Sequence, residues 1–175
     1  CIATTIIPFV VNRIPNIDLN LDGMANELVC SNLPSFFVTL DAGILDNAST
    51  SEYNYIWKKD GIDLTTDSPT LGVNNVGVYT VEVINNSGCS RTRTITVNAS
   101  NVATVDSIDI IDLTDTNSIT VNTTGLGDYE YSLDDSANFW QDSNFFDNVS
   151  AGAHIVFIND KNGCGIITRE IVVVG

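Results

Sequence analysis

The sequence predicts an all-β protein built from two small antiparallel sandwiches in tandem. Two segments, GVYTVEVINNSGC at 77–89 and GAHIVFINDKNGC at 152–164, match in glycine, valine and Gly-Cys positions at a constant offset of 75 residues. A strand-like run follows the cysteine in both segments, and a third such run follows Cys1. Repetition of this kind indicates one structural unit used again along the chain. Apolar residues also alternate with polar ones, which favours strands over helices.

We expect three parts in chain order. Residues 1–15 would form the closing strand of an upstream repeat and a short linker, residues 16–98 a first sandwich, and residues 99–175 a second. A chain of 175 residues accommodates two such units of roughly 80 residues each. No Pro- or Gly-rich spacer occurs near 98–102, so we expect a short, semi-rigid connection there.

Each sandwich should contain about six or seven short strands, because apolar runs of period two are bounded by Gly, Asn, Asp and Ser clusters. Such strands with frequent turns are typical of the immunoglobulin-like sandwich. The turns near Gly88 and Gly163 each supply a glycine that adopts positive φ at little cost. The expected strands are 2–11, 17–21, 35–41, 53–59, 62–65, 70–73, 77–84, 91–97, 106–112, 118–123, 129–133, 145–149, 152–158 and 166–174.

Trp57 is expected in the core of the first sandwich. It shares one side of the run YNYIWKK with Tyr55, because side chains alternate along a strand, and aromatic residues dominate such cores. An exposed platform for sugar stacking is the alternative. Tyr79 follows Gly77 by two residues, a placement that suits a hydroxyl bonded to backbone, and His154 takes this place in the second sandwich. His154 is the one histidine of the chain, so no His-based metal cluster or triad forms within it, and we expect a structural role for this residue.

The chain is strongly acidic, with 22 Asp and Glu against 7 Lys and Arg and a formal charge of −15. Such a surface repels phosphate groups, so we expect no nucleic-acid partner and no direct membrane insertion. No apolar run approaches the roughly 18 residues of a membrane helix. No signal peptide is recognisable, so if the protein is exported we expect its signal to lie upstream of residue 1. No paired carboxylates, nucleophile motif or phosphate loop stand out, and we therefore expect no enzyme activity.

Asp134, Asp135 and Asn138 form an oxygen-rich loop that is a weak candidate for Ca²⁺. The loop lacks the glycine and the spacing of an EF-hand, and a solvated turn explains it more simply. We therefore expect no obligate cofactor, with Ca²⁺ as the one candidate.

Four aromatic residues gather within 139–146. Core packing explains them most simply, but Phe139 and Trp140, if exposed, would offer a stacking surface for glycans or a partner protein. Exposure of Trp140 would favour binding, and its burial would favour a spacer.

The four cysteines permit several pairings, and the sequence alone does not fix which one forms. Cys30 and Cys89 each lie beside a strand end, and a bond between them would close a loop of about 60 residues and stabilise by roughly 4 kcal/mol. Cys164 has no counterpart of Cys30 in its own repeat, so we expect one bond and two unpaired cysteines. A lipid-bearing Cys1 is an alternative, disfavoured because a strand rather than a polar tether follows it.

Nearly the whole chain resembles repeats of large Bacteroidota cell-surface proteins. The second half is similar to SprB-type repeats of gliding-motility adhesins through YEYSLD at 129–134, FxNVxAG at 146–152 and NGC at 162–164. The first half resembles the immunoglobulin-like modules of the same proteins through LDAG at 40–43, YxYxW at 53–57, GxYxVxV at 77–83 and GCS at 88–90.

The resemblance implies a non-catalytic stalk or spacer of a large extracellular adhesin, associated with gliding motility and type IX secretion. It implies attachment to the outer membrane through parts outside this chain. Neighbouring repeats, and outer-membrane secretion or motility proteins, would be its partners. The alternatives are a glycan- or protein-binding module and a non-catalytic appendage of a secreted hydrolase.

The resemblance also implies a bond between Cys30 and Cys89, because many such repeats pair a cysteine shortly before the second strand with the cysteine of Asn-Gly-Cys. The second repeat departs from this pattern, and its His154 replaces the usual tyrosine. Ser107 and Ser136 stand in Asp-Ser-apolar triplets, which match the O-glycosylation pattern of exported Bacteroidota proteins.

Overall fold

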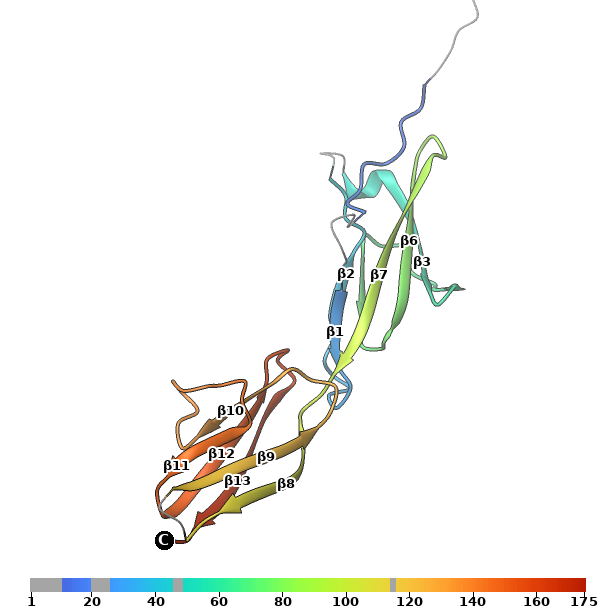
Figure 1. Ribbon diagram of the computed structural model, residues 1–175. Coiled ribbons are helices and arrows are strands. Elements are labelled where there is room, and N and C mark those ends of the chain that lie inside the picture. The colour runs from blue at the N-terminus through green and yellow to red at the C-terminus, as the bar shows by residue number, and fades with distance from the viewer. Residues whose placement is uncertain (1–10, 20–25, 46–48, 114–115) are drawn as a thin grey trace, which may run out of the picture. The chain divides into compact units, whose positions relative to one another are not determined.

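The computed structural model describes residues 11–19, 26–45, 49–113 and 116–175. These residues form β-strands and a single 3-10 turn, η1, at Thr50–Glu52 (Figure 1). The prediction of an all-β protein is confirmed. The chain divides into two compact units: unit 1 comprises the residues up to Asn26 with Thr39–Val73 and Gly77–Thr96, and unit 2 comprises Glu27–Val38, Asn74–Val76 and Val97–Gly175.

The described strands form four sheets. One five-stranded sheet has the order β1-β7-β6-β3-β4, a two-stranded sheet pairs β2 with β5, and two three-stranded sheets have the orders β10-β12-β13 and β11-β9-β8. Their bounds are β1 Asn26–Cys30, β2 Val38–Asp41, β3 Tyr53–Lys59, β4 Ile62–Asp63, β5 Thr70–Val73, β6 Gly77–Asn85, β7 Ser90–Ser100, β8 Thr104–Ile111, β9 Asn117–Thr124, β10 Tyr129–Leu133, β11 Phe145–Val149, β12 Gly152–Asp160 and β13 Gly165–Val173.

Most expected strands are confirmed, and β3, β5, β10 and β11 agree with their predicted bounds. Strand β1 was missed, because NELVC has no period-two alternation and its pairing with β7 forms it. In the described part of 17–21 there is one isolated bridge, from Ile17 to Ile44. The expected strand at 2–11 lies outside the described residues except for Val11.

The core of unit 1 follows from the alternation on β3 and β6. Trp57 has no exposed surface, and its indole N–H donates to the carbonyl oxygen of Ser68 at 2.8 Å. Tyr55 lies on the same face, and its hydroxyl donates to the Thr50 carbonyl at 2.9 Å. The predicted core position of Trp57 is therefore confirmed, and a sugar-stacking role for it is excluded. Tyr79 is also buried, and burial raises the pKa of its hydroxyl above 10.0.

The core of unit 2 lies between its two three-stranded sheets. Tyr131 from β10 and Val156 and Ile158 from β12 meet Ile119 and Val121 from β9. Antiparallel pairing of β12 with β13 over its whole length, and with β10 over Val156–Asp160, fixes this register. One face of each sheet therefore packs into the core, and the turn after β12 lies at the end of the β12–β13 hairpin.

We expect Trp57→Ala to lower the free energy of unfolding by about 3–5 kcal/mol, since it empties the centre of a core. Ile56→Ala is the matched control, because Ile56 points to the opposite face of β3 and is 37% exposed. Its cost should be about 1 kcal/mol or less. Urea unfolding followed by circular dichroism measures both, and equal losses would contradict the assigned core.

Candidate functional site

A disulfide bond joins Cys30 and Cys164 within unit 2. Cys30 ends β1, Cys164 closes the turn after β12, and their Cα atoms are 5.3 Å apart at a sequence separation of 134. Cys89 is a free cysteine and is half-buried. The predicted bond between Cys30 and Cys89 is therefore wrong, while Cys1 lies outside the described residues.

The length of β7 explains why Cys30 does not pair with Cys89. Cys89 directly precedes β7, whereas Ser31, next to Cys30, donates to the carbonyl of Ser100 at its far end through its N–H (2.9 Å) and its hydroxyl (3.1 Å). A strand of 11 residues spans about 35 Å, and a disulfide needs Cα atoms within about 7 Å. Cys89 is thus at the wrong end of the strand.

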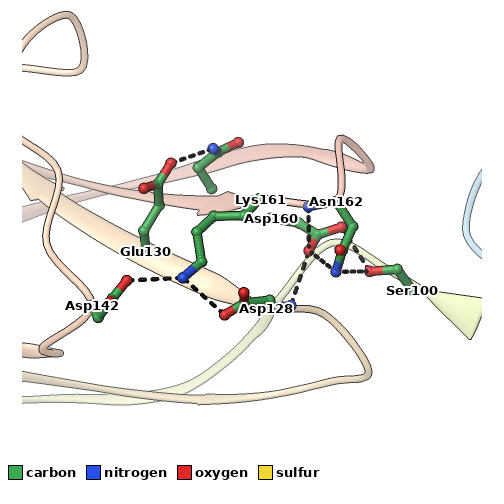
Figure 2. A network of polar contacts seen from close by, with 8 residues as sticks. Ser100, Asp128, Glu130, Asp142, Asp160, Lys161 and Asn162 are labelled. Carbon is green, nitrogen blue, oxygen red and sulfur yellow. Dashed lines mark hydrogen bonds and ion pairs between the residues drawn. The ribbon is translucent and has the colours of Figure 1, made fainter. Parts of the chain in front are cut away.

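The buried carboxylate of Asp160 organises the turn that carries Cys164. Asp160 is 1% exposed and accepts a hydrogen bond from the Ser100 hydroxyl at 2.7 Å (Figure 2). Backbone N–H groups of Asp128, Asn162 and Cys164 donate to it at 3.1, 3.3 and 3.2 Å, and the Asn162 amide donates at 3.1 Å. A buried charge is tolerated when donors surround it in this way.

Lys161 connects the same turn to two neighbouring loops. Its ammonium group lies 3.0 Å from Asp128 and 2.9 Å from Asp142, as Figure 2 shows. The hydrogen bonds to Asp142 and then to Asp128 raise the pKa of Lys161 above 10.5. All three side chains are at least one-third exposed, so this ion-pair group positions loops more than it stabilises them.

Two residues of unit 2, one earlier and one later in the sequence, form hydrogen bonds to the segment 98–102, where a short connection is expected. Asn32 accepts the N–H of Val102 at 3.2 Å, and the Tyr129 hydroxyl lies 2.9 Å from the Asn101 side-chain oxygen. A Cβ atom at Gly127 would come within 2.3 Å of the Tyr129 ring. The sequence Gly-Leu-Gly before Asp128 thus leaves room for the tyrosine that clamps this segment.

His154 and Asp134 form a second polar pair in unit 2. The ring Nδ1 lies 2.7 Å from the Asp134 carboxylate and Nε2 lies 2.8 Å from the Ser150 carbonyl. Because both partners accept, the doubly protonated imidazolium satisfies both contacts. The bond to Asp134, followed by that to Ser150, raises the pKa of His154 above 6.5, against the opposing effect of burial. The structural role predicted for His154 matches these contacts.

The carboxylates of the proposed Ca²⁺ loop are engaged with their own surroundings. Burial tends to raise the pKa of Asp134, but hydrogen bonds from His154 and from the Ile155 N–H lower it overall. Asp135 accepts the Ala137 N–H at 2.9 Å and lies 3.3 Å from the Asn138 amide. In the described part of the chain, no group of three or more His, Cys, Asp or Glu residues is arranged to hold a metal ion.

The aromatic residues of 139–146 divide between the surface and the interior. Phe139 is 73% exposed, whereas Trp140 is half-buried and its indole N–H donates to the Ser136 carbonyl at 3.1 Å. Phe145 and Phe146 line an open hollow of about 390 Å³ that also reaches His154. Trp140 is neither fully exposed nor fully buried, so its exposure does not decide between a spacer and a binding module.

Both serines of the predicted O-glycosylation triplets are exposed. Ser107 lies at a bulge in β8, where its hydroxyl accepts the Asn122 amide at 2.9 Å. Ser136 lies in the turn before Trp140. Modification of either serine stays a prediction. Among the described residues no helix is long and apolar enough to cross a membrane.

Comparisons with known proteins identify the fold. No protein-family model matches the chain, and no curated protein does. The immunoglobulin domains 1–5 of Sidekick-1 match with a TM-score of 0.54 and 15% identity, over 85% of this chain and 37% of that one. Sidekick-1 domains 1–4 give 0.51 and 14%, over 85% and 46%. The first eight immunoglobulin domains of Down Syndrome Cell Adhesion Molecule give 0.51 and 11%, over 87% and 26%.

These likenesses establish tandem immunoglobulin-like domains, as the sequence predicted. At such low identity they define the fold and nothing finer. The chain spans less than half the length of each of these three structures. The resemblance to SprB-type repeats finds no support beyond this shared immunoglobulin-like fold.

We expect the imidazole of His154 to titrate above 6.5 in the folded chain. The stabilisation it gives is then complete below pH 6.5 and is lost as the pH rises through the folded-state pKa. An NMR titration follows it without ambiguity, because the chain has one histidine. Asp134→Asn should return the midpoint toward 6.5, whereas Asp135→Asn, the neighbouring control, should leave it unchanged; a wild-type midpoint at or below 6.5 would contradict the pair.

We expect Asp160→Ala to lower the free energy of unfolding by about 3 kcal/mol, because it leaves several buried donors without an acceptor. Asp160→Asn should cost less, since asparagine keeps one acceptor oxygen at this place. Asp142→Ala is the control: its side chain is 83% exposed, and its loss should cost about 0.5 kcal/mol or less. Denaturant unfolding of the oxidised chain measures all three, and similar losses for Asp160→Ala and Asp142→Ala would sink the assigned role.

Proposed function

We propose that this chain is a non-catalytic, load-bearing segment of an extracellular adhesion-type protein. Its tandem immunoglobulin-like fold is shared with Down Syndrome Cell Adhesion Molecule, whose name states an adhesive role. The Cys30–Cys164 disulfide supports an extracellular location, because such bonds form and persist in oxidising surroundings. The polar groups of unit 2 bond to one another and to backbone, which favours a structural role over catalysis.

The disulfide is the observation that carries the mechanical part of the proposal. It joins residues 134 positions apart, so residues 31–163 lie inside a covalent loop. Tension applied to the two ends of the chain therefore passes from Cys30 to Cys164 and bypasses the strands between them. In the chain-entropy account a loop of this length also stabilises the folded state by about 5 kcal/mol. Both effects suit a spacer that resists extension.

A narrower proposal follows from the sequence resemblance. The chain would be a stalk repeat of a Bacteroidota adhesin exported by type IX secretion, with neighbouring repeats and outer-membrane secretion or motility proteins as partners. Support for it comes from the motifs at 129–134 and 162–164 and from the acidic surface. Loss of the protein from the surface of cells lacking type IX secretion would test it, with a periplasmic protein as control.

A second candidate function is glycan or protein binding. The observation in its favour is Phe139, which is 73% exposed beside the half-buried Trp140. Exposed aromatic rings stack on sugars and pack into partner pockets. Binding of the 175-residue chain on a glycan array, abolished by Phe139→Ala and retained by Ile111→Ala at another exposed apolar site, would favour this candidate.

Single-molecule pulling from both ends tests the load-bearing proposal. The sequence separation of 134 between the two cysteines corresponds to about 450 Å of extended chain at about 3.4 Å per residue. We expect that the oxidised chain does not release this contour length at any force that leaves the disulfide intact. The Cys30→Ser, Cys164→Ser double variant should release it as the units unfold.

Cys89→Ser is the matched control, because it removes a thiol and leaves the Cys30–Cys164 bond in place. It should behave like the oxidised wild-type chain. If the oxidised chain released the full length, the load would not run through this bond, and the mechanical proposal would fail.

A further inference from the structure

The free thiol of Cys89 lies in a turn of distinctive construction between β6 and β7. Asn85 ends β6, and its side-chain oxygen accepts the N–H groups of Ser87 and Cys89, both at 3.0 Å. The N–H of Gly88 donates to the Asn85 carbonyl at 2.9 Å, and Gly88 has φ of +78°. The turn is therefore closed on Asn85 from both its side chain and its backbone.

The turn between β12 and β13 repeats this construction 75 residues later. Asp160 takes the place of Asn85, and its carboxylate accepts the N–H groups of Asn162 and Cys164 at 3.3 and 3.2 Å. The N–H of Gly163 donates to the Asp160 carbonyl at 2.9 Å, and Gly163 has φ of +85°. The cysteine of this turn is 2% exposed and disulfide-bonded to Cys30.

Each turn also binds a residue near the junction with the preceding repeat. The Asn85 amide donates to the Arg13 carbonyl at 2.6 Å, and Asp160 accepts the Ser100 hydroxyl at 2.7 Å. In the second turn this contact delivers the disulfide partner, because the Ser100 carbonyl binds Ser31, the residue after Cys30. Cys164 thus bonds to Cys30 at the end of β1, and β1 pairs with β7, the closing strand of the preceding repeat.

We propose that Cys89 is the bonding site for a preceding repeat of the same kind. Its partner would be a cysteine at the end of a strand that pairs beside that repeat's closing strand, as Cys30 ends β1 beside β7. Cys89 is half-buried and carries a free thiol. It occupies the same place in its turn as Cys164, which is bonded to Cys30. The run after Cys1 resembles in sequence the runs after Cys89 and Cys164, which indicates that such a repeat comes before residue 16.

The chemistry is thiol–disulfide exchange during export. Two thiols lose two protons and two electrons as the sulfur–sulfur bond forms, and a disulfide-bearing oxidant of the export compartment is reduced to a dithiol. In a series of repeats linked in this way, each disulfide would close a covalent loop around the strands between its two cysteines. A series of repeats would then resist extension along its whole length, beyond what the Cys30–Cys164 bond does alone.

The test is peptide mapping of the native protein under non-reducing conditions, after free thiols are trapped with N-ethylmaleimide. We expect the Cys89 peptide to be linked to a cysteine peptide that is absent from residues 1–175, alongside the Cys30–Cys164 pair. Trapped Cys89, or Cys89 linked to Cys1, would overturn the inference. Either outcome beside an intact Cys30–Cys164 bond would leave the load path through that bond untouched.

The isolated 175-residue chain gives a second measurement. Without the partner repeat, Cys89 should react with N-ethylmaleimide in the folded protein, and Cys89→Ser should remove one equivalent of label. Ser87→Ala is the control, since it changes a neighbouring side chain of the turn and leaves the thiol. A Cys89 that reacts only after unfolding would show that the turn does not present it, and would also overturn the inference.

Discussion

The carboxylate of Asp160 is the constraint on which the arrangement of unit 2 depends. A charged group that is 1% exposed must have donors around it, and this need fixes the turn backbone, the Asn162 amide and the Ser100 hydroxyl together. Because Ser100 also accepts two hydrogen bonds from Ser31, Cys30 is brought to the cysteine of the turn. The disulfide thus completes a geometry that hydrogen bonds already define.

The covalent loop closed by this bond changes how the protein answers to force. Antiparallel strands resist tension through hydrogen bonds that are individually weak, about 1 kcal/mol each in net stability. A disulfide placed near both ends of the folded part carries the same tension through one covalent bond. The strands between Cys30 and Cys164 are thus shielded from tension applied to the two ends of the chain, which is what the proposed spacer role requires.

Several basic residues of this acidic protein pair with carboxylates. Lys161 lies between Asp128 and Asp142, Lys58 pairs with Asp63 at 2.8 Å, and Arg93 contacts Asp18 at 3.1 Å. With 7 basic residues against 22 acidic ones, the chain keeps a formal charge of −15. Like charge on neighbouring copies opposes their association, which would suit the proposed spacer role.

The sequence by itself determined the fold class, most strands and the core position of Trp57, because period-two alternation and repeated Gly-Cys turns are local signals. It located the turn that carries Cys164, yet not the role of Asp160 in it, since the burial of a carboxylate depends on what packs over it. Strand β1 and the pairing of Cys30 were decided by tertiary structure. Both depend on the far end of β7, about 35 Å from Cys89, and no short-range pattern reports which end of a strand its neighbour reaches.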